Sequence, residues 1–173
     1  MRRLATLVCA ALLSACAQMP TSAPPLVTLG VQFNAAEARA LLADGVNVIK
    51  GNAFMRQKGG GVVTCAGAVV YLIPATEYAK RRISYLYGTT GETGYNARRR
   101  DVRFDPESQE YISLMKSTRC DAQGNFTFDR VADGEFFVQT TVAWEVAQRL
   151  QGGNLMHRVK VTGGQVVNLV LSS

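Results

Sequence analysis

The chain has 173 residues, and its 19 basic and 13 acidic side chains give a formal net charge of +6. A length of this order fits one domain with its own hydrophobic core. Because the basic excess is small, and because the first residues predict export from the cytoplasm, the composition argues against a nucleic-acid partner.

The first fifteen residues have the organisation of a bacterial lipoprotein signal peptide. Arg2 and Arg3 form a positive start, and ten uncharged residues follow them, from Leu4 to Leu13. This stretch is about half of the ~20 residues that a helix needs to cross a bilayer. It ends in Leu13-Ser14-Ala15-Cys16, which resembles the lipobox read by lipoprotein signal peptidase. We therefore predict cleavage before Cys16 and lipidation of its thiol, with an ordinary secretory signal as the alternative.

The predicted anchor also implies a location. Acyl chains on Cys16 would hold the protein on a membrane permanently, since each buried methylene contributes about 0.8 kcal/mol. Inner-membrane lipoproteins of enteric bacteria resemble one another in having Asp after the cysteine, so Ala17 predicts sorting to the outer membrane, facing the periplasm. Three prolines lie within residues 17–25. We expect residues 16–30 to form the lipidated cysteine and a flexible tether, and residues 31–173 to form one domain.

The first half of that domain predicts two short helices among strands. Asn34 caps a helix that starts at Ala35, because Glu37 follows at the capping-box position and Gly45 can end it. Thr76 caps a second helix, which reaches Tyr87. Stretches rich in β-branched residues predict strands over residues 46–55, 62–64 and 68–73. Residues 88–110 are expected to form a long polar loop.

The second half predicts short strands separated by turns. Strands are expected over residues 111–119, 126–131, 136–144, 158–162 and 166–171. Turns are expected over residues 121–125, 132–134 and 151–154, and Gly163-Gly164 is expected to close a hairpin between the last two strands. This regular spacing predicts an all-β fold, an antiparallel Greek-key sandwich with one or two short helices.

Two stretches of the sequence resemble the carboxypeptidase regulatory-like domain family. Residues 120–138 match its hairpin pattern of turn glycines and alternating aromatic residues through Asp121, Gly124, Phe126, Phe128, Val131, Gly134 and Phe136. Residues 66–74 look like the strand of the family that ends in proline. The resemblance implies a transthyretin-like sandwich. It says little about function, since these domains serve many proteins as accessory, adhesive or binding modules.

Two cysteines remain in the predicted domain, Cys65 and Cys120. In an oxidising envelope an isolated pair is expected to form a disulfide, with two buried free thiols as the alternative. The only histidine is His157, which disfavours a zinc site or a histidine-dependent catalytic triad. The spacing after Asp121 does not fit a calcium-binding EF-hand, because Ala132 stands where its last carboxylate belongs. We therefore expect no metal and no cofactor.

Two runs of basic residues lie within the stretch 76–103, and Arg103 follows the second run. They are expected to bind phosphate or carboxylate groups on lipid A, peptidoglycan or another envelope protein, with a solvated surface as the alternative. The candidate residues are Lys80, Arg81, Arg82, Arg98, Arg99, Arg100 and Arg103.

These observations favour a membrane-anchored envelope lipoprotein with a non-catalytic binding or structural module. Two other functions remain open from the sequence. An envelope hydrolase acting on cell-wall or glycan substrates would need an acid pair such as Glu92 and Asp101. An accessory subunit of a secretion or export complex would need a flat apolar patch.

Overall fold

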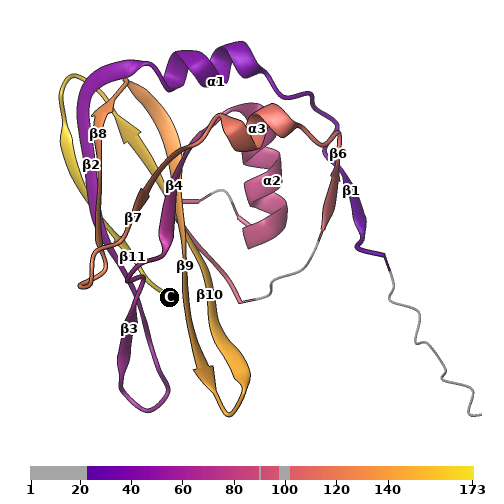
Figure 1. Cartoon of the computed structure of the whole chain (residues 1–173). Helices are drawn as coiled ribbons and strands as arrows, with labels where there is room; N and C mark the ends of the chain where they lie inside the picture. Colours follow the sequence, from indigo (N-terminus) through magenta and orange to yellow (C-terminus); the bar gives the residue numbers. More distant parts are fainter. Residues whose placement is uncertain (1–22, 90, 98–101) are drawn as a thin grey trace, which may run out of the picture.

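Two open β-sheets face each other in the computed structural model, which describes residues 23–89, 91–97 and 102–173 (Figure 1). The first sheet is antiparallel throughout. Its strands, in spatial order, are β5 (Thr93–Asn96), β10 (Arg149–Val161), β9 (Gly134–Val146), β4 (Val69–Pro74) and β7 (Lys116–Arg119). The predicted sandwich-like, mostly β architecture is therefore confirmed.

The second sheet is built around the long strand β2 (Asp44–Arg56). Strand β8 (Asn125–Val131) pairs with it on one side, β3 (Val62–Thr64) continues that pairing at its end, and β11 (Val166–Leu171) lies on the other side. The β11–β2 pair is parallel. The prediction of purely antiparallel pairing is wrong here, because β10 and β11 belong to different sheets and Gly163-Gly164 closes no hairpin.

The side chain of Asn47 explains why the chain crosses between the sheets at this point. Its Oδ1 accepts hydrogen bonds from the backbone N–H groups of Gly164 and Gln165, both at 2.9 Å. The next residue of β2, Val48, donates its N–H to the carbonyl of Gln165. These bonds place the start of β11 alongside β2, in the other sheet from β10.

Within the described residues three helices accompany the sheets, one more than predicted. Asn34 caps helix α1 (Ala35–Leu41) by accepting a bond from the Glu37 N–H, and Thr76 caps α2 (Glu77–Tyr87). Gly88 ends α2 in the left-handed conformation that glycine favours. The additional helix is α3 (Gln109–Ser113), within a stretch partly expected to be strand.

The expected loop at residues 88–110 contains regular structure. Strand β5 extends the first sheet, and β6 (Arg103–Asp105) pairs in parallel with β1 (Leu26–Thr28). Strand β1 thus lies within the stretch expected to be tether. Because this pairing joins residues nearly 80 positions apart, no local sequence pattern predicts it.

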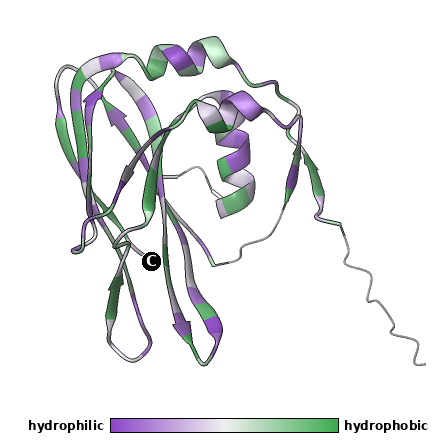
Figure 2. Ribbon diagram, in the orientation of Figure 1, coloured by the Kyte–Doolittle hydropathy of each residue, from purple (hydrophilic) through white to green (hydrophobic). Residues whose placement is uncertain are grey.

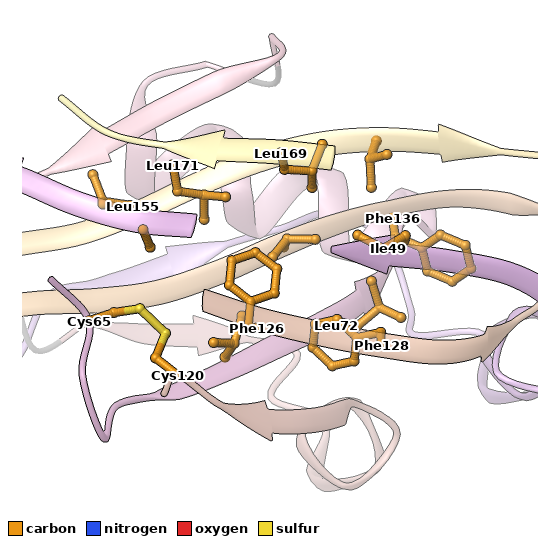
Figure 3. Close-up of a cluster of buried hydrophobic side chains, with 14 of the residues drawn as sticks. Ile49, Cys65, Leu72, Cys120, Phe126, Phe128, Phe136, Leu155, Leu169 and Leu171 are labelled. Atoms are coloured by element: carbon orange, nitrogen blue, oxygen red, sulfur yellow. A yellow bond between two sulfur atoms is a disulfide. The ribbon is translucent and has the colours of Figure 1, made fainter. Parts of the chain in front are cut away.

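Hydrophobic side chains of the described residues form two buried clusters, one on each face of the first sheet. The cluster between the sheets includes Ile49, Phe126, Phe136 and Leu155, and it encloses the Cys65–Cys120 disulfide (Figure 3). The second cluster packs α2 against the other face of the sheet. Figure 2 shows hydrophobic and hydrophilic residues interspersed along the strands, as expected where successive side chains face opposite sides. The predicted disulfide is confirmed, with the two Cα atoms 5.8 Å apart.

Candidate binding cleft

A cleft of about 800 Å³ lies between the β2–β3 hairpin and the β9–β10 hairpin. In Figure 1 these two hairpins form the lower end of the sandwich, away from α1. Apolar and aromatic lining comes from Met55, Tyr95, Trp144 and Val146. We refer to this feature as the hairpin cleft.

Strand alternation places Trp144 in the hairpin cleft. On β9, Val138, Val142 and Trp144 share the face that looks toward the second sheet, and Val142 is fully buried in the central cluster. Trp144 is half-buried and packs on the edge of that cluster. It is also the only tryptophan in the chain. The indole ring of Trp144 therefore lies at the edge of the core and lines the cleft.

Tyr95 enters the same cleft from β5, on the other side of β10. It lies opposite Leu155 in the strand register, and its hydroxyl donates to the carbonyl of Gly152 at 3.3 Å. A Cβ atom on Gly153 would lie 2.8 Å from Cε2 of the Tyr95 ring and 2.4 Å from a backbone oxygen. Only glycine at position 153 leaves room for the ring beside the strand.

The expected turn at residues 151–154 is therefore wrong, and these residues lie within β10. The chain reverses earlier, at Ala147 and Gln148, which both take positive φ angles. Neither residue is a common choice for such a conformation, so the turn carries no glycine signal. The glycines of β10 instead allow close approach of a neighbouring side chain.

Polar groups complete the lining of the hairpin cleft. Gln57 and Gln151 contribute amides, and Arg56, Lys58 and Arg149 contribute cations. None of the lining residues, all within the described part of the chain, carries a carboxylate. The arrangement offers aromatic faces, amide donors and acceptors, and positive charge, which are groups that bind a polar ligand without reacting with it.

The basic residues of α2 face different directions and have acidic partners. Lys80 lies 3.7 Å from Glu135, and Arg81 lies 3.0 Å from Glu77 one turn away. Arg82 is only 13% exposed in its side chain and pairs with Glu107 at 2.8 Å. Consecutive helical residues do not share a face, which explains this divergence.

The guanidinium of Arg82 is enclosed by aromatic rings. It lies 4.1 Å from the centroid of Phe104 and 4.8 Å from that of Tyr111. Tyr111 is buried, and this burial raises the pKa of its hydroxyl. Arg82 thus joins α2 to β6 and α3, as a structural contact within the domain.

The other candidate cations are placed only in part. Arg103 lies exposed on β6, whereas Arg98, Arg99 and Arg100 fall outside the described residues. A shared face for both basic runs therefore stays a prediction. The same holds for the proposed acid pair, because Glu92 is exposed and Asp101 is outside the described residues.

The described residues contain no group of three or more histidine, cysteine or acidic side chains arranged to bind a metal ion. His157 is half-buried in β10, and its Nδ1 lies 2.9 Å from the Arg158 carbonyl oxygen. Across residues 23–89, 91–97 and 102–173, no helix has the length and apolar character needed to span a membrane.

Comparison with known proteins shows a similarity in fold. No protein-family model matches the chain, and no curated protein sequence matches it. Among solved structures, the fold is similar to one from Pseudomonas aeruginosa described as "a putative carbohydrate binding protein". The match has a TM-score of 0.66 and 22% sequence identity, and it covers 83% of this chain and 99% of that one. At this identity the similarity establishes the fold.

Proposed function

We propose that this protein is a non-catalytic saccharide-binding module of the bacterial cell envelope, and that the hairpin cleft is its binding site. The observation that carries the proposal is the pairing of Trp144 and Tyr95 with the Gln57 and Gln151 amides in one open cleft. A sugar ring has apolar C–H faces and a rim of hydroxyl groups. Aromatic rings suit the faces, and amides suit the hydroxyls.

Two further observations support binding over cleavage. Glycoside hydrolases generally use a pair of carboxyl groups beside the scissile bond. The lining of the hairpin cleft, which lies wholly among described residues, supplies none. The similar Pseudomonas structure, described as "a putative carbohydrate binding protein", agrees with this interpretation.

The envelope location rests on the sequence and on the disulfide. Disulfides persist mainly outside the reducing cytoplasm, so the Cys65–Cys120 bond agrees with export. We infer from the lipobox that Cys16 is acylated and that Ala17 directs the protein to the outer membrane, facing the periplasm. A carboxypeptidase regulatory-like, transthyretin-like ancestry of the sandwich remains part of this proposal.

Replacing either aromatic residue of the cleft should abolish most of the binding. A panel of immobilised neutral and acidic oligosaccharides is probed with the wild-type protein and with the Trp144→Ala and Tyr95→Ala variants. Aromatic contacts at the centre of an interface commonly contribute 2 kcal/mol or more. We expect retention of at least one saccharide by the wild type and a loss of about 30-fold in affinity in each variant.

Tyr71→Ala is the matched control, because Tyr71 is 41% exposed against 39% for Tyr95 and lies on the other face of the first sheet. This variant should bind like the wild type. Circular dichroism of each variant checks that it folds. A wild-type protein that retains no saccharide, or folded cleft variants that bind normally, would refute the proposal.

The anchor is tested separately. Cys16→Ser should eliminate incorporation of radiolabelled palmitate and leave the precursor uncleaved, because the peptidase requires the acylated cysteine. Cys9→Ser is the control, and it should be labelled and processed like the wild type. Continued palmitate labelling of the Cys16→Ser protein would rule out the assigned lipidation site.

A further inference from the structure

Several basic side chains of the described residues take part in no ion pair, and three of them line the hairpin cleft. Ion pairs within the described residues involve Arg39, Lys80, Arg81, Arg82, Lys116, Arg130 and Arg158. Arg56, Lys58 and Arg149 take part in none of these pairs, and each is exposed to solvent. Their charge is therefore available to a ligand.

These three cations come from both hairpins that wall the cleft. Arg56 ends β2, where it alternates with the buried Met55 and so lies at the outer edge of the cleft. Lys58 follows it in the turn toward β3, whereas Arg149 begins β10. The adjacent carboxylate on β9, Glu145, alternates with Trp144 and so faces the opposite side of the sheet. Positive charge thus flanks the aromatic groups from two directions with no acid among the lining residues, all of them described.

We propose that the hairpin cleft selects acidic oligosaccharides, whose carboxylate groups bind Arg56, Lys58 and Arg149 while their rings contact Trp144 and Tyr95. The inference rests on the proposed saccharide-binding function and names the ligand class. An arginine guanidinium matches a carboxylate through two parallel hydrogen bonds. Because the cations lie on separate hairpins, they suit a chain with several carboxylates better than one small anion.

The selectivity is measured by isothermal titration calorimetry of the purified full chain. The probes are trigalacturonate and trimannuronate, each compared with its methyl ester, which keeps the sugar and removes the charge. We expect at least one acid to bind 10-fold or more tightly than its ester at 50 mM NaCl. Raising the salt to 500 mM should reduce that ratio, since ions screen exposed charges.

A triple variant tests whether the three cations of the cleft cause the preference for the acid over its ester. Arg56→Gln, Lys58→Gln and Arg149→Gln together should bring the affinity for the acid down to that for the ester. The matched control replaces Lys50, Arg103 and Lys160 with Gln, which removes the same net charge outside the cleft and should leave the ratio unchanged. A cleft variant that keeps the preference, or a control variant that loses it, would overturn the assignment.

The two proposals fail in different ways. If neutral saccharides from the panel bind, and no acid binds more tightly than its ester, the charge selectivity is wrong and the saccharide site stands. If no saccharide of either kind binds, the proposed function itself is wrong. Inorganic phosphate at the concentration of the acid should not displace it; displacement would show a simple anion site and overturn the oligosaccharide assignment.

Discussion

Replacing Cys65 and Cys120 together with alanine should lower the free energy of unfolding by about 4 kcal/mol, since the bond closes a long loop in the unfolded chain. The cysteines are 55 positions apart in the sequence. For a domain of this size, about 4 kcal/mol corresponds to a fall in Tm of roughly 8–16 °C. Thermal and urea denaturation followed by circular dichroism measure both quantities.

The disulfide joins one wall of the hairpin cleft to the first sheet. Cys65 directly follows β3, whose hairpin with β2 forms one wall, and Cys120 directly follows β7 in the other sheet. Reductant should lower the Tm of the wild type and leave that of the double variant unchanged. A double variant within 1 kcal/mol of the wild type would show that the disulfide contributes little to the fold.

Asn47→Ala should destabilise the domain by about 3–5 kcal/mol, since each buried polar group left without a partner costs about 1–3 kcal/mol. Asn47 is fully buried. Its Nδ2 donates to the Val131 carbonyl at 2.9 Å and to Asp133 at 2.8 Å, and its Oδ1 accepts the two N–H groups that precede β11. One side chain thus joins three segments of the chain.

A second measurement tests whether the lost stability comes from the hydrogen bonds of Asn47. The hydrogen bond from Asn47 lowers the pKa of the Asp133 carboxyl, so this pKa should rise in the Asn47→Ala protein, as measured by NMR titration. Asn52→Ala is the control on the same strand, where the side chain bonds to the exposed turn at residues 123–125. A loss no larger in Asn47→Ala than in Asn52→Ala would contradict the role assigned to Asn47.

Local patterns in the sequence predicted the elements that local chemistry determines. Both capped helices begin where Asn34 and Thr76 predicted, and the alternating Phe126 and Phe128 lie buried between the sheets. The failures concern long-range pairing. The parallel β11–β2 pair depends on bonds between Asn47 and residues more than 110 positions away, which no hairpin rule includes.

The hairpin cleft was not predicted, because its two aromatic residues lie almost 50 positions apart. They converge only when the expected loop forms β5 and pairs with β10. A pair of glycines inside a strand was the available signal, since such residues often mark a close approach. The basic run on α2 was predicted to contribute to one binding surface. Its three adjacent residues point in three directions and pair with different acidic residues.

The emission of Trp144 tests the central claim most directly, because the chain has no other tryptophan and this one lines the cleft. Saccharides retained in the panel are titrated into the wild-type protein, and the fluorescence is followed to saturation. We predict a saturable change in intensity or wavelength with the same dissociation constant as calorimetry gives. Binding by calorimetry with unchanged Trp144 emission would place the saccharide elsewhere and contradict the assignment of the cleft.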